Sequence, residues 1–218
     1  MHSAKIVAMT KPIINNENDL VMDASEFVAY CARVSNPSNQ MNNQTSQKLL
    51  DYCKRNNHWS VFEMVHVVME ITTTRDIARQ ILRHRSFSFQ EFSQRYADPT
   101  NDLGFVLKET RLQDTKNRQN SLETEDNNAI ARFEAMQDEM IDKASSMYVE
   151  AINMGIAKEQ ARAFLPEGLT VSKLYMAGSL RSWIHYCDLR RGNGTQKEHR
   201  WVAESAWNEL IHYFSSIK

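Results

Sequence analysis

The sequence predicts an α/β (α+β) fold, in which a helix-rich single domain surrounds a small central sheet. Apolar residues recur with helical spacing over most of the chain, and two segments in its first third predict strands, the second of them through alternating apolar residues. The length of 218 residues suits one large domain, and contents of 42% hydrophobic and 24% charged residues are typical of a globular protein. We therefore expect one domain over residues 1–218.

Two segments predict strands. Residues 5–13, KIVAMTKPI, form the first, which Pro12 should end. Residues 63–73, EMVHVVMEITT, form the second and are rich in β-branched side chains. Apolar residues alternate along it, namely Val65, Val67, Met69 and Ile71. This alternation predicts a strand with one buried face.

Helical patterns precede and follow the second strand. Residues 23–35 begin with Asp23 and Glu26 at the spacing of a capping box, and residues 46–58 predict a second helix. Residues 74–85, TRDIARQILRHR, predict a third. Its buried stripe would consist of Ile77, Ala78, Ile81 and Leu82. Its arginines recur every four residues and would share one face, namely Arg75, Arg79 and Arg83.

The second half of the chain predicts further helices after a polar segment. Residues 101–127 are weakly periodic, and we expect a long loop or mobile insertion there. A helix should cover residues 128–154 and stop at Gly155, and a short helix should reach Leu165 before Pro166. Residues 172–191 also have a helical pattern. After the GNG break, Thr195 and Glu198 predict a second capping box and a last helix that runs almost to Lys218.

The totals exclude several classes of protein. The net charge of −1 argues against binding a polyanion over the whole surface, so anion recognition must come from a local cluster. No apolar run approaches the roughly 20 residues that span a bilayer, and the N-terminus lacks a secretory pattern, so we expect a cytoplasmic protein. The isolated Cys31, Cys53 and Cys187 suggest small buried hydrophobic residues rather than a disulfide framework.

Cationic and aromatic side chains are concentrated between Ile81 and Pro99. Arg83 and Arg85 flank His84, and their guanidinium groups suit a phosphate. The alternation of Ser and Phe that follows indicates a half-buried strand or extended loop, with Phe87 and Phe89 in the core. The segment therefore predicts the polar edge of a pocket, with aromatic side chains packed beneath it.

The same residues fit other chemistries less well. The Arg/aromatic patch at residues 75–96 also suits a single-stranded nucleic-acid-binding protein, although the patch is short and no known nucleic-acid motif surrounds it. The histidines lack the spacing of a metal site, so we expect no metal. Ser93 lacks the sequence context of an activated nucleophile, and none of the cysteines has convincing surroundings for a thiolate.

The stretch Arg83-His84-Arg85, followed by seven residues and then Ser93, resembles the signature of the flavin-dependent thymidylate synthases. Further blocks of the chain are similar to that family in the same order, namely ARVSNP at 32–37, HWSVFE at 58–63, ARAFLP at 161–166 and GSLRSWIHYCDLR at 178–190. The resemblance covers nearly the whole chain. It is closest to a shorter branch of the family, in which KNRQNS and NGTQKEH also occur.

The resemblance implies an enzyme, with one catalytic domain, that methylates dUMP to dTMP. Methylenetetrahydrofolate would donate the carbon, and FAD reduced by NADPH would supply the hydride, without a cysteine nucleophile. It also implies a homotetramer whose active sites lie at subunit interfaces. The resemblance implies no nucleic-acid partner, and no membrane partner is expected.

The resemblance also implies roles for individual residues. The expected dUMP ligands are Gln80, Arg83, Glu91, Ser93, Gln94, Arg95, Arg162 and Arg190. The expected FAD contacts are His58, Ser60, Glu63, Arg83, His84, Arg85, Ser179, Arg181 and His185. Arg190 is the expected catalytic residue, because a guanidinium beside the uracil ring stabilises negative charge there without a thiolate. The chain departs from the common family pattern at Val61, Met64, Ser179 and Gly194.

Overall fold

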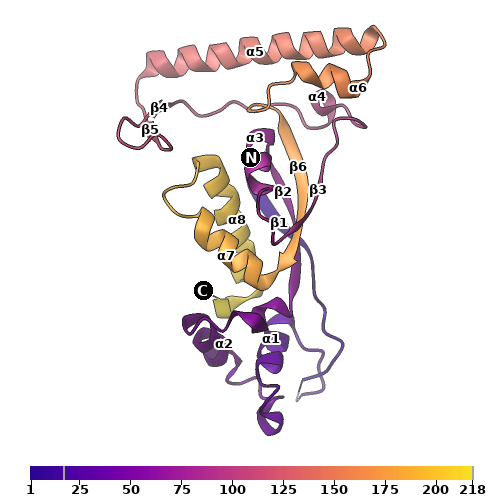
Figure 1. The fold of residues 1–218 in the computed structure, drawn as a ribbon, viewed down its shortest axis with the longest axis vertical. Coiled ribbons are helices and arrows are strands. Elements are labelled where there is room, and N and C mark those ends of the chain that lie inside the picture. The colour runs from indigo at the N-terminus through magenta and orange to yellow at the C-terminus, as the bar shows by residue number, and fades with distance from the viewer. Residues whose placement is uncertain (17, 218) are drawn as a thin grey trace.

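The computed structural model describes residues 1–16 and 18–217, and its centre is a four-stranded sheet (Figure 1). The strands are β1 (Ser3–Met9), β2 (His66–Thr74), β3 (Ser88–Glu91) and β6 (Val171–Ser179). They lie in the order β1-β2-β6-β3, and every neighbouring pair is antiparallel. The predicted combination of helices and a small central sheet is therefore confirmed.

The alternation predicted for the second strand is confirmed in β2. Val67, Met69 and Ile71 are wholly buried, and so is Val65 just before the strand. Met69 lies opposite Met176 of β6 in the register of the sheet. The buried face of the sheet thus consists of side chains that point the same way on adjacent strands.

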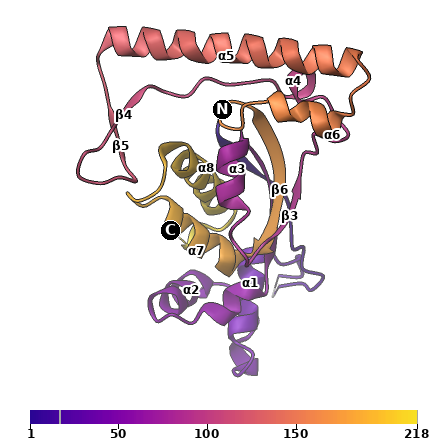
Figure 2. The same cartoon turned by 45° about the horizontal axis from the view of Figure 1, so that its top comes forward.

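Three helices cover that face of the sheet: α3 (Arg75–Ile81), α7 (Leu180–Arg190) and α8 (Lys197–Tyr213) (Figures 1 and 2). Trp183 of α7 is fully buried, and its indole N–H donates to the Val67 carbonyl at 3.0 Å. Burial of a large aromatic residue with its polar atom satisfied stabilises the contact between helix and sheet. The helices that carry the candidate site residues are thereby held on a rigid support.

Two more helices, α1 (Ala24–Ala32) and α2 (Ser46–Arg55), lie at one end of the molecule (Figure 1). The predicted capping box of α1 is confirmed, because the Asp23 side chain accepts from the Glu26 N–H and the Glu26 side chain accepts from the Asp23 N–H. Short 3-10 turns lie at Pro37–Asn39, Trp59–Glu63, Arg162–Phe164 and Ser215–Ile217.

The polar segment at 101–127 forms a long arm rather than one featureless loop. The segment follows α4 (Pro99–Asp102) and contains a small hairpin of β4 (Arg111–Gln113) and β5 (Ser121–Glu123). Four ion pairs attach it to the helical body: Lys108 with Asp76 at 3.0 Å, Arg111 with Glu198, and Lys197 of α8 with both Glu109 at 2.9 Å and Glu123 at 2.7 Å. The arm is therefore held against α3 and α8 by charge pairs.

Beyond the arm, α5 (Asn127–Asn153) crosses the end of the molecule opposite α1 and α2, and α6 (Lys158–Ala161) packs beside it (Figure 1). The predicted long helix is confirmed. Gly155 follows it with φ +82°, a conformation that favours glycine and ends the helix as predicted.

The helix predicted over residues 172–191 is wrong in its first half. Residues 171–179 form β6, which pairs with β2 on one side and β3 on the other. Leu174 and Met176 are fully buried, and Tyr175 between them is exposed. Residues with good helix propensity are extended here because two neighbouring strands supply backbone hydrogen bonds on both edges.

The second predicted capping box is also wrong. The N-cap of α8 is Gln196, with no capping bond from its side chain, and the Glu198 carboxylate pairs with Arg111 instead. This helix ends at Tyr213 and is followed by the last 3-10 turn, and Lys218 lies outside the described residues. The third helix ends at Ile81, so Arg83 lies in the turn that follows rather than on the same helix face as Arg75 and Arg79.

The predicted burial of the three cysteines and of Leu82 is confirmed in part. Cys53 and Cys187 are buried, whereas Cys31 is only half-buried. Leu82, expected in the buried stripe of α3, is also half-buried. Across residues 1–16 and 18–217, none of the helices has both the length and the apolar character needed to cross a membrane.

Gly178 provides a test of the packing between β6 and Phe87, which follows the signature residues 83–85. A Cβ atom at this position would lie 2.5 Å from Cδ1 of Phe87, which is a steric overlap. We expect Gly178→Ala to lower the free energy of unfolding by about 1–3 kcal/mol, because the Phe87 ring must move out of its contact with Trp183. Urea denaturation measures this. In the control Gly168→Ala, the new Cβ atom has no other atom within 4 Å, so the loss of stability should be much smaller. Equal losses in the two variants would contradict a steric overlap between residue 178 and Phe87.

Candidate functional site

The signature residues lie in the turn that leaves α3. Arg83 and Arg85 are exposed, whereas His84 is half-buried and turned toward α7. Arg190, at the end of α7, donates from its Nε to Nε2 of His84 at 2.9 Å. Because Arg190 is always a donor, His84 must be neutral and carry its hydrogen on Nδ1. The expected catalytic arginine thus contacts the signature directly.

A second histidine, His199 of α8, lies behind this pair in a buried hydrogen-bonded chain. Its Nδ1 is 3.2 Å from the side-chain oxygen of Gln80, and its Nε2 is 3.1 Å from the Tyr186 hydroxyl. Gln80 in turn donates to the side-chain oxygen of Gln196 at 2.7 Å. The Gln80 oxygen only accepts, so His199 donates from Nδ1 and accepts the Tyr186 proton at Nε2. Gln80 is therefore held from both sides.

Burial and nearby cations keep both histidines neutral. Loss of solvation, with Arg190 and Arg83 adding repulsion, lowers the pKa of His84 to about 4. Loss of solvation, followed by Arg190 and His84, lowers the pKa of His199 to about 3. A proton on either ring would add a cation beside Arg190 and remove an acceptor that the network uses.

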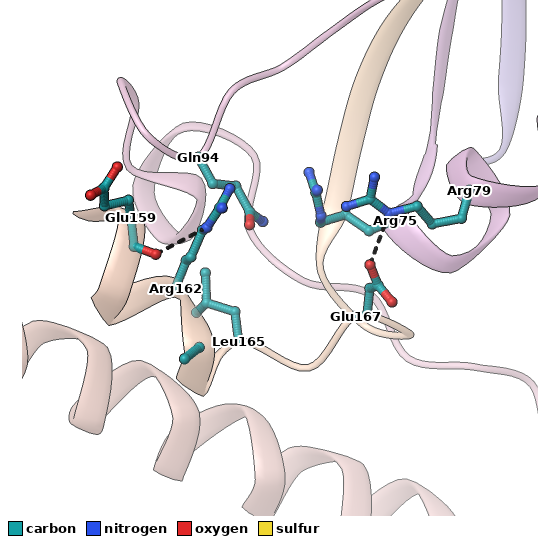
Figure 3. A pocket seen from close by; sticks show the side chains of 8 residues that line it. Arg75, Arg79, Gln94, Glu159, Arg162, Leu165 and Glu167 are labelled. Atoms are coloured by element: carbon teal, nitrogen blue, oxygen red, sulfur yellow. Dashed lines mark hydrogen bonds and ion pairs between the residues drawn. The ribbon is translucent and has the colours of Figure 1, made fainter. Parts of the chain in front are cut away.

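A separate cavity of about 380 Å³ lies between α3, the loop after β3 and the segment after α6 (Figure 3). We call it the arginine pocket. Its lining includes Arg75, Arg79, Arg162 and Gln94, with the carboxylates of Glu159 and Glu167 at its margin. Figure 3 shows the side chains of Arg162 and Gln94 facing those of Arg75 and Arg79 across the space. Four groups rich in N–H donors therefore converge on one cavity.

The donors of the arginine pocket are incompletely satisfied. Gln94 is 5% exposed, and its Nε2 has no hydrogen-bond partner in the described chain. Arg79 pairs with Glu167 at 3.0 Å, whereas the one acceptor for Arg162 among the described residues is the Glu159 backbone carbonyl at 3.2 Å. Buried polar groups are usually hydrogen-bonded, so an orphaned amide donor beside guanidinium groups indicates space for an anion.

Three further expected dUMP ligands, Glu91, Ser93 and Arg95, contact residues of this pocket or lie next to one that does. Glu91 is held by Ser172 at 2.8 Å and by buried Arg75 at 3.4 Å. Arg95 pairs with Glu159 at 3.2 Å, and the Ser93 hydroxyl lies 3.4 Å from the Arg95 N–H. Within one chain, Arg95 is thus bound at the rim of the arginine pocket, whereas Arg190 is bound to His84.

Four expected flavin contacts gather in another cavity, of about 470 Å³, at the start of α7. We call it the α7 pocket. Its lining consists of Glu63, His66, Ser86, Ser179, Arg181, Ser182 and His185. Arg181 forms an ion pair with Glu63, and Ser179 caps α7 by accepting from the Ser182 N–H at 3.2 Å. The start of a helix beside an arginine suits a phosphate group.

Besides Arg83, His84 and Arg85 of the signature, two expected flavin contacts lie outside that cavity. His58 is exposed and packs edge-on against Tyr52, and Ser60 lines a neighbouring apolar cavity with Val61 and Met64. Conversely, Arg75 and Arg79 line the arginine pocket although no ligand contact was predicted for them. The signal was present, since these residues are four apart on α3, but charge spacing alone does not say which cavity a helix face borders.

Among residues 1–16 and 18–217, no group of three or more His, Cys, Asp or Glu side chains is arranged to hold a metal ion.

The comparisons with known proteins cover nearly the whole chain. The model of the thymidylate synthase complementing protein family matches residues 19–214. A probable flavin-dependent thymidylate synthase of Paramecium bursaria Chlorella virus 1 is 46% identical over 215 residues, which is 99% of this chain and 96% of the viral protein. The chain belongs to the flavin-dependent thymidylate synthase family. This membership makes it an enzyme of the methyltransferase class.

A second curated relative and a solved structure are also similar to this chain. The flavin-dependent thymidylate synthase of Synechocystis sp. is 47% identical over 213 residues, which is 98% of this chain and 96% of that protein. The crystal structure of a UMP/dUMP methylase PolB from Streptomyces cacaoi, bound with 5-Br UMP, has a TM-score of 0.79 and 22% identity. It covers 100% of this chain and 92% of the other, which shows that the two share a fold.

The neutral histidines make stability depend on pH. Below pH 6.5 the unfolded chain binds protons at His84 and His199, whereas the folded chain does not until the pH approaches 4. The two neutral histidines therefore cost no stability above pH 6.5, where neither the folded nor the unfolded chain binds protons at them. The free energy of unfolding should fall from about pH 6.5 to about pH 4, by up to about 1.4 kcal/mol per pH unit for each histidine.

Urea denaturation at several pH values measures this slope. His199→Gln should flatten it, whereas the control His212→Gln, at an exposed position of α8, should leave it unchanged. Equal slopes in all three proteins would show that His199 does not titrate in this way.

Proposed function

We propose that this enzyme converts dUMP to dTMP by reductive methylation, with methylenetetrahydrofolate as carbon donor and FAD and NADPH as the source of hydride. The observation that carries the proposal is the hydrogen bond between Arg190 and His84 of the signature. Family membership supports the reaction class, and the donor-rich cavities support a phosphorylated substrate and a dinucleotide cofactor.

Arg190 activates the pyrimidine in this proposal. Its guanidinium lies beside N3 and O4 of the uracil and stabilises the negative charge that pushes electron density toward C5. His84 accepts a hydrogen bond from Nε of Arg190. The N–H groups on the two terminal nitrogens of this guanidinium therefore stay available to donate to the substrate. Neutral His84 thus orients the cation without adding charge to it.

The cysteines support a route without a thiolate. Burial raises the pKa of Cys31, Cys53 and Cys187. Each therefore remains a thiol at neutral pH, and a thiol is a poor nucleophile for C6 of the pyrimidine. Polarisation of the uracil by Arg190 replaces that attack.

The phosphate of dUMP binds in the arginine pocket. Gln94 and Arg162 offer the free donors described above, and Arg95 and Glu91 lie at its edge. A phosphate monoester carries about −1.5 to −2 charges at pH 7 and suits bidentate guanidinium contacts. Arg83, Gln80 and Ser93 complete the nucleotide site.

The α7 pocket fits part of a flavin dinucleotide, because Arg181 and the start of α7 attract a diphosphate while Glu63, Ser179 and His185 add polar contacts. Arg85, His84, Ser60 and His58 would complete the cofactor site. The bound flavin would supply the hydride chemistry that side chains lack. The chain's own part is to bind the dinucleotide and to hold Arg190 in place.

Assembly into a homotetramer accounts for the separation of these groups in one chain. Arg95 and Arg190 belong to different local clusters, so an active site shared between subunits would unite the arginine pocket of one copy with the signature of another. The long helix α5 supports association, because it exposes large apolar side chains, namely Phe133, Met136, Met140 and Met147.

Release of tritium from 5-tritiated dUMP tests the reaction. Release should require methylenetetrahydrofolate and stop without reduced flavin, and the purified protein should be yellow. A colourless protein that takes up no flavin, and binds single-stranded oligonucleotides with a steep salt dependence, would contradict the proposal and favour the nucleic-acid alternative.

We expect Arg190→Lys to reduce turnover about 100- to 1,000-fold, because lysine cannot donate to His84 and the pyrimidine in the same planar geometry. The tritium-release assay measures this. Arg191→Lys is the matched control, because Arg191 instead stacks on Trp207 at 4.2 Å. Near-normal turnover in the Arg190 variant would show that this residue does not activate the substrate.

We expect Arg162→Ala to weaken dUMP binding about 10- to 100-fold, because a charge-assisted phosphate contact is lost. Calorimetry with dUMP and with deoxyuridine separates the phosphate from the base. The deoxyuridine affinity should stay unchanged, and so should both affinities in the control Arg132→Ala on α5. Equal losses for both ligands would place Arg162 at the base rather than at the phosphate.

A further inference from the structure

Arg33, at the end of α1, is a buried cation without a carboxylate partner. The residue is 7% exposed, and no Asp or Glu of the described chain lies within 4.0 Å of its guanidinium. Burial alone lowers its pKa, with no contribution from a neighbouring charge. Burying an unpaired charge is costly, so this arrangement indicates a missing counter-ion.

The guanidinium of Arg33 lies at the N-terminus of α2, where a cation is least favoured. It donates to Thr45 Oγ1 at 2.9 Å and to Ser46 Oγ at 3.4 Å. Thr45 is the N-cap residue, and its hydroxyl makes no capping bond to the first turn. That turn contains no acidic residue to offset the positive end of the helix dipole. The buried cation and the helix terminus therefore repel each other.

Arg33 and Thr45 line a cavity of about 420 Å³, which Lys48 of α2 also lines. Neutral donors complete the lining, namely Ser35, Asn36 and Asn39. Glu26, on the same helix as Arg33, is already used by the Asp23 N–H and by Asn43. The described lining contains no carboxylate, in contrast to the arginine pocket.

We propose that this cavity between α1 and α2 is a phosphate-binding site, in which Arg33, Lys48 and the N-terminus of α2 bind the anion. The lining of this cavity contains none of the residues to which the proposed function gives dUMP or FAD. An anion here supplies the missing counter-ion of Arg33 and the missing cap of α2 at once.

The phosphate belongs either to a nucleotide or to free inorganic phosphate. A second cavity, of about 460 Å³, adjoins the first at Ala32 and is lined by Tyr30, Val34, Val61 and Met64 among others. This apolar neighbour would accept the ring of a nucleotide whose phosphate reaches Arg33, and it also contains Ser60, which the proposed function gives to FAD. AMP and inorganic phosphate are therefore the two probes.

Calorimetric titration of the full-length protein with inorganic phosphate tests the site. We expect a phosphate isotherm that persists in Arg162→Ala, which removes a donor from the arginine pocket. In that background, Arg33→Gln and Lys48→Gln should each weaken binding about tenfold or more. If AMP binds more tightly than phosphate in an Arg33-dependent manner, the natural ligand is a nucleotide; equal affinities identify inorganic phosphate.

Lys48→Glu provides a second readout that does not depend on the folding of an Arg33 variant. A carboxylate at this exposed position would replace the anion, so the melting temperature without phosphate should rise above that of Lys48→Gln and no longer respond to phosphate. Gln47→Glu is the matched control, because it adds the same charge to the first turn of α2 outside the cavity lining.

Unchanged phosphate affinity in both the Arg33 and Lys48 variants would overturn the proposal. So would equal stabilisation by Lys48→Glu and Gln47→Glu, since the effect would then belong to the helix dipole alone. A carboxylate of a second copy bound to Arg33 in the assembled protein would also overturn it.

Discussion

The hydrogen bond from Arg190 to His84 is the constraint on which the candidate site depends. It joins the turn after α3 to the end of α7, and it requires a neutral imidazole as the acceptor. The buried chain of Gln196, Gln80, His199 and Tyr186 lies directly behind this bond. Each member has one orientation in which its donors and acceptors match those of its neighbours. The network therefore holds the side chains next to the signature in a single arrangement.

Unpaired positive charge is the second common feature. The chain is nearly neutral, with a net charge of −1, yet Arg162 and Arg33 each border a cavity without a carboxylate partner in the described residues. Such local excess costs free energy in the isolated chain. It is explained most simply if anionic ligands supply the opposite charge, as the proposed nucleotide and phosphate sites require.

The sheet and the long arm show how the site is supported. The central strands β2 and β6 are more than 90 residues apart in the chain, but their register places α3 and α7 on one face. The arm is held to α8 through Arg111 and Glu198, in the same helical turn as His199. A disturbance of the arm would therefore reach the buried network through the first turn of α8.

The local features follow from the amino-acid sequence: the capping box of α1, the alternation of β2, the glycine that ends α5, and the signature residues 83–85 and 93. Each depends on residues close together in the chain, where spacing decides the outcome. Only the tertiary structure decided that residues 171–179 form a strand, that Glu198 pairs with Arg111 rather than capping a helix, and that Arg75 and Arg79 border the arginine pocket. These outcomes depend on partners supplied by distant segments, and their contacts override local propensity.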